Sequence, residues 1–134
     1  MSKSKAKGTA AEREVVRYLK NWWPDVERRA LSGNKDKGDV AGIPGVVVEV
    51  KAAAKQLIGP WQRETLVEMH HADADHCVLV VKRPYKPVSQ WDAYIPAHQL
   101  NLALKGALAD GEGALTWLRM DLALAAAVLR SQGR

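Results

Sequence analysis

Residues 37–53 read KGDVAGIPGVVVEVKAA. Two runs rich in β-branched residues flank the segment IPG, which predicts two antiparallel strands joined by a tight turn. With the turn centred on Pro44, Asp39 and Glu49 lie at equal separations before and after it. They would then be neighbours across the two strands, with Cβ atoms about 5 Å apart. Glu49 and Lys51 share a face because side chains alternate along a strand.

Two carboxylates that converge in this way repel each other, so the fold needs something that neutralises them. Lys51 supplies one positive charge, and a divalent cation would supply more. Oxygen ligands alone favour Mg²⁺ or Mn²⁺ over zinc. The alternative is a surface hairpin with an ordinary Glu–Lys pair, which contributes about 0–1 kcal/mol.

The positive charge of the chain is concentrated near its beginning. The net charge is +5, and residues 1–37 hold ten Lys and Arg against five Asp and Glu, which is the same surplus. A basic segment suits a polyanion such as nucleic acid, although it also suits a solvated tail. A metal on paired carboxylates, surrounded by cations, is a layout for phosphodiester hydrolysis, in which Lys51 would orient or activate the attacking water. Glu12 is the candidate for a third acidic group.

Length and composition predict one folded domain. The chain has 134 residues, of which 47% are hydrophobic, enough for a single core. The lone cysteine, Cys77, cannot form an internal disulfide, which fits a reducing cytoplasm. No signal peptide or membrane span is expected, because the most apolar segment is interrupted by Arg119 and Asp121.

The expected elements alternate between helices and strands. A flexible basic arm over residues 1–8 precedes a helix that begins at the N-cap Thr9 and ends before Pro24. Further strands are predicted over 26–31, 39–42, 46–52, 76–82 and 91–95, a second helix over 59–72, and a helical extension over 97–134 that resumes at residue 114. This order predicts an α/β fold with a mixed central sheet flanked by helices.

At this point the residues resemble a known family. Asp39 and the segment Glu49-Val50-Lys51 are similar to the PD-(D/E)XK nuclease motif, with Gly38 in place of the motif's proline. More specifically, the chain from Lys7 to Lys82 resembles the archaeal-type Holliday junction resolvases. The matching positions are Lys7-Gly8, Glu12-Arg13, Arg28, Ser32-Gly33, Asp39, Glu49, Lys51 and Gln62.

The resemblance implies a restriction-endonuclease-like core that forms a homodimer and cuts four-way DNA junctions in a prokaryotic or phage-infected cytoplasm. Glu12, Asp39 and Glu49 would hold Mg²⁺, for which Mn²⁺ can substitute, and Lys51 would serve the water. The residues expected to bind DNA are Lys5, Lys7, Arg13, Arg28, Arg29, Ser32, Lys35, Lys37 and Gln62. Two alternatives stay open: a nuclease of the same fold that nicks DNA or cuts flaps, and a DNA-binding module without catalysis.

Two other features carry less weight. The segment HHADADHC, residues 70–77, is rich in metal ligands, but adjacent histidines diverge on a helix and no second Cys/His cluster completes a zinc site. We interpret it as a helix C-terminus, with histidines near the negative end of the helix dipole. Among the five tryptophans, Trp61 beside Gln62 is the candidate for contact with DNA bases.

Overall fold

The structure is a computed structural model that describes residues 2–29, 37–100 and 116–134. Its centre is a six-stranded sheet in the order β1-β2-β3-β4-β5-β6. The strands are β1 (Glu27–Arg28), β2 (Val40–Ala41), β3 (Val46–Lys51), β4 (His76–Val81), β5 (Asp92–Pro96) and β6 (Trp117–Asp121). The helices are α1 (Lys3–Leu19), α2 (Ile58–His71), α4 (Leu122–Ser131) and the short 3-10 helices η1 (Val88–Gln90) and η2 (Ala97–Gln99). Strands β3 and β4 are parallel and the other neighbours antiparallel, so the sheet is mixed.

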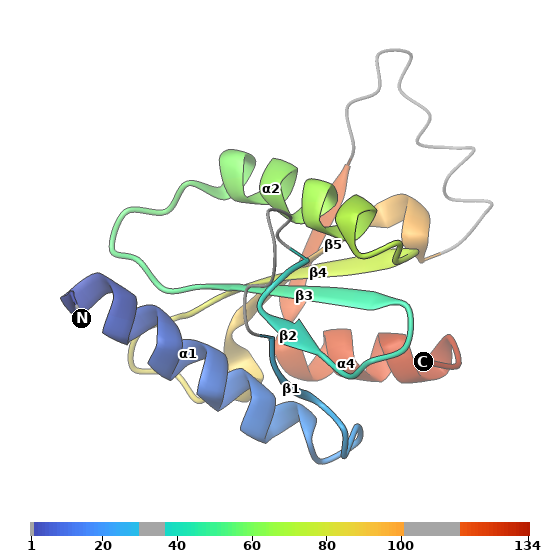
Figure 1. The fold of residues 1–134 in the computed structure, drawn as a ribbon, viewed down its shortest axis with the longest axis horizontal. Coiled ribbons are helices and arrows are strands. Elements are labelled where there is room, and N and C mark those ends of the chain that lie inside the picture. Colours follow the sequence, from blue (N-terminus) through green and yellow to red (C-terminus); the bar gives the residue numbers. More distant parts are fainter. Residues whose placement is uncertain (1, 30–36, 101–115) are drawn as a thin grey trace.

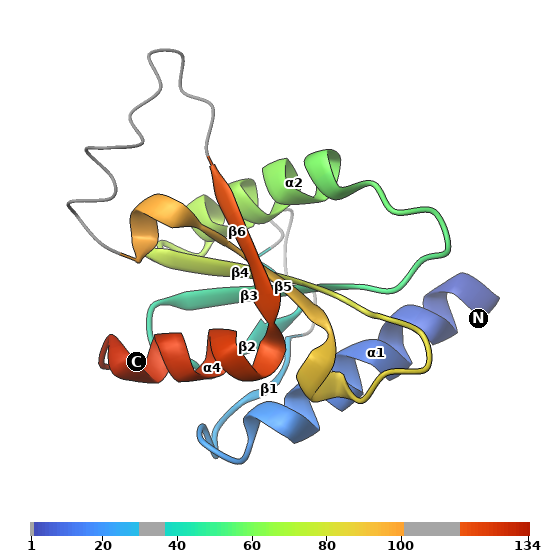
Figure 2. The same ribbon diagram turned by 180° about the vertical axis from the view of Figure 1, so that it is seen from behind.

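The helices form two layers, one on each face of the sheet. Helix α2 covers one face, and α1 and α4 lie against the other (Figures 1 and 2). The main apolar core lies on the α1 and α4 side, where Val46, Val48 and Val50 of β3 pack with the buried faces of both helices. The core on the α2 side is much smaller and centres on Trp61. Side chains alternate along β3, so Glu49 belongs to the α2 side, where apolar packing is sparse.

Most of the predicted elements are confirmed. Strand β1 lies within the predicted segment 26–31, and the hairpin, α2, β4 and β5 all form where the sequence places them. In the hairpin, Val40 lies opposite Val48, which is the register that a turn centred on Pro44 predicts. The fold is therefore a mixed α/β fold, as expected. No helix among the described residues is long and apolar enough to cross a membrane.

The two ends of the chain differ from the prediction. Helix α1 begins at Lys3, with Ser2 as the N-cap whose hydroxyl accepts the backbone N–H of Lys5, so residues 3–8 are helical and Thr9 lies inside the helix. Residues 117–121 form β6, which pairs along its whole length with β5, and α4 begins only at Leu122. The prediction of a helix from residue 114 was therefore wrong for residues 117–121 and is confirmed from Leu122 onward. Of the helical extension predicted from residue 97, residues 97–99 form the 3-10 helix η2, and residues 101–115 lie outside the described part of the chain.

Candidate metal and phosphate site

The β2–β3 hairpin holds Asp39 in place beside Glu49. The backbone N–H of Asp39 donates to the carbonyl of Val48 at 3.0 Å, and its side-chain Oδ2 accepts the N–H of Val50 at 2.9 Å. The preceding Gly38 has φ +94°, and an added Cβ would lie 2.6 Å from Cγ1 of Val47. Glycine is therefore required at this position, directly before Asp39.

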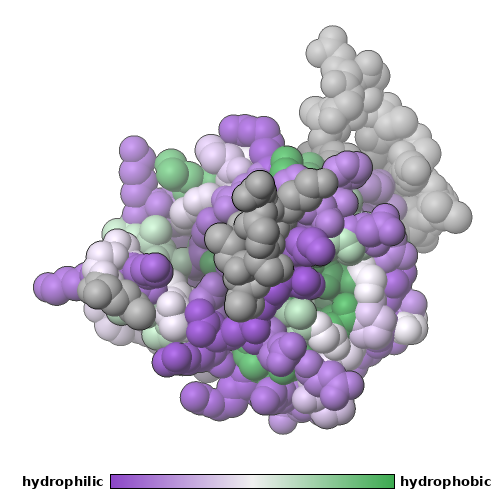
Figure 3. Space-filling view, in the orientation of Figure 1, coloured by the Kyte–Doolittle hydropathy of each residue, from purple (hydrophilic) through white to green (hydrophobic). Residues whose placement is uncertain are grey.

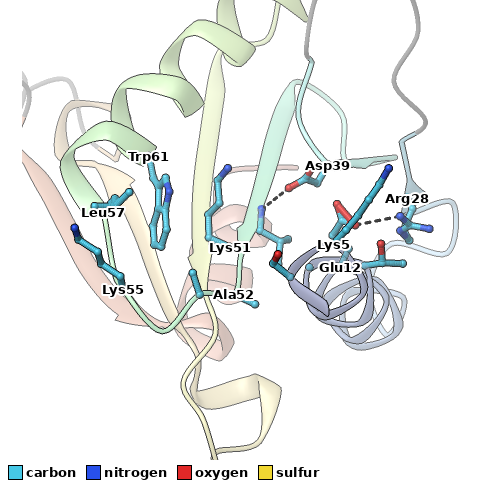
Figure 4. A pocket seen from close by; sticks show the side chains of 14 residues that line it. Lys5, Glu12, Arg28, Asp39, Lys51, Ala52, Lys55, Leu57 and Trp61 are labelled. Carbon is cyan, nitrogen blue, oxygen red and sulfur yellow. Dashed lines mark hydrogen bonds and ion pairs between the residues drawn. The ribbon is translucent and has the colours of Figure 1, made fainter. Parts of the chain in front are cut away.

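Helix α1 brings Glu12 to the same place. Its buried residues Ala11 and Val15 dock on the sheet, which turns the adjacent Glu12 toward Asp39. Oε2 of Glu12 also accepts a hydrogen bond from Arg28 at 3.1 Å. Asp39 therefore stands between Glu12 and Glu49, and its carboxyl group interacts with both. The structure places Asp39 beside both Glu12 and Glu49 (Figure 4 shows Glu12 and Asp39), but the carboxylate oxygens of these three residues do not all lie within 4.8 Å of one another.

Burial has a strong effect on these carboxyl groups. The pKa of Asp39 is raised to about 8, first by burial and then by Glu49. The pKa of Glu49, whose residue is only 1% exposed, is raised to about 9, mainly by burial and further by Glu68. The pKa of Glu12 is also raised, by burial and by Asp39. Facing carboxylates are compatible only when a proton or a cation lies between them, so the site suits a positive ion.

Lys51 is held as a cation within this acidic group. Its Nζ lies 3.5 Å from Oε2 of Glu49 and 3.0 Å from Oε2 of Glu64. Burial lowers the pKa of Lys51, but the attraction of these two carboxylates outweighs burial and leaves the pKa above its ordinary value. Lys51 therefore carries a positive charge at neutral pH, as the prediction that it neutralises Glu49 requires.

Sequence reasoning missed two acidic residues of α2, Glu64 and Glu68. Together with Glu49 they form a group that could hold a metal ion, because one carboxylate oxygen from each lies within 4.8 Å of the others. It is the one such group among the described residues. Glu68 is 1% exposed, and Oε1 of Glu49 is buried with no hydrogen-bond partner in the described part of the chain. The spacing of Glu64 and Glu68, four residues apart and on the helix face that also holds the buried Trp61, could have revealed them.

A pocket of about 570 Å³ opens beside the acidic row. Helix α1 forms one wall, and the segment that leads into α2, with Leu57 and Trp61, forms the opposite wall (Figure 4). Lys5, Arg28, Lys51 and Lys55 line the pocket with Glu12 and Asp39. Such a set of cations around two carboxylates can bind an anion and a metal ion together.

The other predicted DNA-binding residues are spread around this pocket. Arg13 and Arg28 line a neighbouring groove of about 280 Å³. Lys7 is exposed on α1, Lys37 and Gln62 are partly buried, and Arg29 lines a separate pocket near the hairpin turn. Ser32 and Lys35 lie outside the described residues. Trp61 is 8% exposed and packs on Leu79 and Val81, with one edge at the pocket wall.

The histidine-rich segment behaves as the sequence predicts. His70 and His71 occupy the last turn of α2, near the negative end of the helix dipole. Cys77 is fully buried in β4 as a free cysteine. No group of three metal ligands within the described residues includes either histidine or Cys77.

No protein-family model, curated protein or solved structure matches this chain. The site therefore has to be interpreted from its own residues and geometry.

Proposed function

We propose that the protein is a metal-dependent nuclease that hydrolyses phosphodiester bonds in DNA. One observation carries the proposal. The partly buried carboxyl groups of Glu12 and Asp39 and the buried Glu49 lie beside one another, and the pocket at Glu12 and Asp39 also presents Arg28 and Lys51. Buried acidic groups are costly without a cation, and the exposed Lys5 and Lys55 leave positive charge at the pocket for an anion. A metal ion and a phosphate group satisfy both requirements together.

The donor set fits Mg²⁺, with Mn²⁺ as a substitute, because it consists of carboxylate oxygens alone. Asp39, Glu49 and Glu12 would hold the ion in the arrangement that the sequence resemblance implies. When bound, the ion would polarise the phosphate and make a water molecule nucleophilic near neutral pH. The raised pKa values of Asp39 and Glu49 and the orphan Oε1 of Glu49 are the features that support this fit.

The other residues of the pocket would bind and orient the substrate. Lys51 is charged, so its role is to stabilise negative charge on the phosphate and to orient the water by hydrogen bonding rather than to accept its proton. Arg28, fixed by its contact with Glu12, and Lys5 would hold the phosphate oxygens from the α1 side. Lys55 would approach from the opposite wall.

The group of Glu49, Glu64 and Glu68 offers a second arrangement for the ion. Glu49 belongs to both sets, and Lys51 lies between Glu49 and Glu64 in the described structure. The two arrangements differ in which substitution weakens binding of the ion. Mn²⁺ titration followed by electron paramagnetic resonance should show that Glu12→Gln weakens binding, if the resemblance holds. Weakening by Glu64→Gln alone would place the ion on the α2 side.

We propose a four-way DNA junction as the substrate and a restriction-endonuclease-like core as the fold. The hairpin β2–β3, the crossover through α2 to the parallel strand β4, and α1 behind the hairpin support this fold. Paired symmetric nicks would need two active sites related by a twofold axis, and therefore a homodimer. The choice of a junction rests on the family resemblance, because selectivity for branched DNA comes from the shape of the whole dimer.

The test compares a labelled four-way junction with a matched linear duplex, a flap and a single strand, each in Mg²⁺ and in EDTA. Paired symmetric nicks in the junction alone, only with Mg²⁺, are the expected result. Asp39→Asn should slow cutting by about 100-fold or more. Glu14→Gln, which removes the same charge from an exposed site on α1, should cut normally.

Other results would change the assignment. Equal cutting of the flap or the linear duplex would retain the nuclease and reject the junction as its substrate. Binding of DNA without any cutting in Mg²⁺ or Mn²⁺ would identify a non-catalytic DNA-binding module. Normal cutting by Asp39→Asn would show that the site lies elsewhere.

A further inference from the structure

Beside the pocket lies a second concave surface that the proposed function does not use. We call it the α1 groove; it has a volume of about 280 Å³ and is lined by Arg13, Val16, Arg17, Lys20 and Arg28. The lining residues of α1 follow the spacing i, i+3, i+4 and i+7, so they share one face of the helix. Val16 is buried and forms an apolar floor, and the other four residues are cations.

Three of the four cations of the groove have no ion-pair partner among the described residues. Arg28 contacts Glu12, but within the described residues no carboxylate lies within 4.0 Å of a cationic atom of Arg13, Arg17 or Lys20. Like charges spaced three and four residues apart on a helix repel each other. The helix dipole favours Arg17 and Lys20 near the end of α1, and the ion pair with Glu12 brings Arg28 of β1 to the same side of the helix.

The groove is continuous with the candidate site through one residue. Arg28 lines both the pocket and the α1 groove, and Arg13 directly follows the pocket residue Glu12. The surface over the C-terminal half of α1 and β1 is mostly hydrophilic (Figure 3). A polyanion with phosphate in the pocket would therefore meet the α1 groove next, across Arg28.

We propose that the α1 groove is a second phosphate-binding subsite, which takes the DNA backbone on the strand that enters the pocket. This inference rests on the proposed function, because it takes DNA as the occupant. The new residues are Arg17 and Lys20, which neither the motif nor the pocket includes. Contacts to backbone phosphates position a duplex without reading its sequence, so the groove sets the path of the strand across Arg28.

The salt dependence of DNA binding tests this inference without cleavage. Each phosphate that a cation neutralises contributes about −0.9 to the slope of log K against log salt concentration for duplex DNA. For the double variant Arg17→Gln/Lys20→Gln, the slope measured with a linear duplex in EDTA should therefore be less negative by about 1.8. Between 50 and 200 mM salt, the affinity of the unmodified protein should consequently fall about 12-fold further than that of the variant.

The matched control is Arg119→Gln/Arg134→Gln, which removes two charges from β6 and the C-terminus and should leave the slope unchanged. An unchanged slope for the groove variant would overturn the proposal. Equal losses for the two double variants would also overturn it, since overall charge alone would then explain them. A further outcome is that inorganic phosphate stabilises the unmodified protein against urea while the groove variant keeps the DNA-binding slope of the unmodified protein. That result would reject DNA as the occupant and assign the groove to a free anion.

The two proposals fail in different ways. A reduced slope in a protein that cuts no DNA would retain the groove and reject the nuclease. Cutting of DNA with an unchanged slope would retain the nuclease and reject the groove.

Discussion

Replacing Glu49 by glutamine should make the metal-free protein more stable at pH 7.5, although Glu49 is one of its most buried residues. The side chain of Glu49 lies on the α2 side of β3 among Asp39, Glu64 and Glu68. Glutamine has nearly the same shape but carries no charge, and its amide group can donate hydrogen bonds to the neighbouring carboxylates. The substitution therefore removes a buried acidic group without leaving a cavity.

The magnitude follows from the pKa of Glu49, which rises from 4.5 to about 9 on folding. A pKa raised by folding contributes stability that is present below the unfolded value and is lost as the pH rises through the folded value. At pH 7.5 the loss amounts to at most about 4 kcal/mol, from three pH units at about 1.4 kcal/mol each. Rearrangement of the hydrogen bonds around the introduced amide group offsets part of this difference, so we expect a net gain of about 1–3 kcal/mol.

Urea denaturation at pH 5, 7.5 and 9 in EDTA measures this difference. The two proteins should be nearly equal in stability at pH 5, and the advantage of Glu49→Gln should grow as the pH rises. Addition of Mg²⁺ should reverse the order at pH 7.5, because an ion at about 1,000 times its dissociation constant stabilises the unmodified protein by about 4.1 kcal/mol. The variant should show little response to Mg²⁺.

The exposed Glu14 supplies the control, since Glu14→Gln removes the same charge from α1 and should change neither the pH dependence nor the response to Mg²⁺. The reasoning would be refuted if Glu49→Gln were less stable than the unmodified protein at pH 9 without metal. A full response of the variant to Mg²⁺ would remove Glu49 from the metal site.

Three further predictions concern the rest of the fold. Gly42→Ala should cost about 2–3 kcal/mol in urea denaturation, because Gly42 has φ +104° and an added Cβ would collide with the carbonyl oxygen of Asp25. Gly8→Ala should instead stabilise the protein by about 0.5–1 kcal/mol in the same assay, since Gly8 lies inside α1 and an added Cβ meets nothing within 4 Å; a loss of stability would contradict the helical start of α1. Burial raises the pKa of the Cys77 thiol to about 12, so a thiol reagent at pH 8 should label Cys77 only in urea, and fast labelling of the native protein would contradict its burial in β4.

The sequence predicts the acidic hairpin well because its information is local. The turn residues fix the register, and alternation along β3 then fixes which side chains share a face. Val40 opposite Val48, and Lys51 beside Glu49, follow from these two rules. Glu12 was predicted as a third acidic group from the charge pattern and from the family resemblance, but its position beside Asp39 depends on the docking of α1 on the sheet, which is a tertiary contact.

The errors occur where tertiary pairing overrides local preference. Residues 117–121 contain leucine, arginine and methionine, which favour helix, yet they pair with all of β5. Helix α1 begins before Thr9 because Ser2 is as suitable an N-cap residue as Thr9. Gly8 is tolerated inside the helix and does not end it. The spacing of Glu64 and Glu68 indicates that they share the α2 face of Trp61, but their contact with Glu49 is a tertiary contact with a strand that this spacing does not reveal.

The uneven distribution of apolar residues between the two faces of the sheet supports a ligand at Glu49. The face covered by α1 and α4 has an extensive apolar core, and the α2 face has a small one centred on Trp61. Glu49 and Glu68 occupy positions on that second face where apolar side chains would pack without a desolvation penalty. Their burial weakens the metal-free fold, and a bound cation would convert the same carboxylates into stabilising ligands. Positions where the local rules of folding are broken in this way are expected at functional sites, and here they coincide with the acidic group that adjoins the cationic pocket.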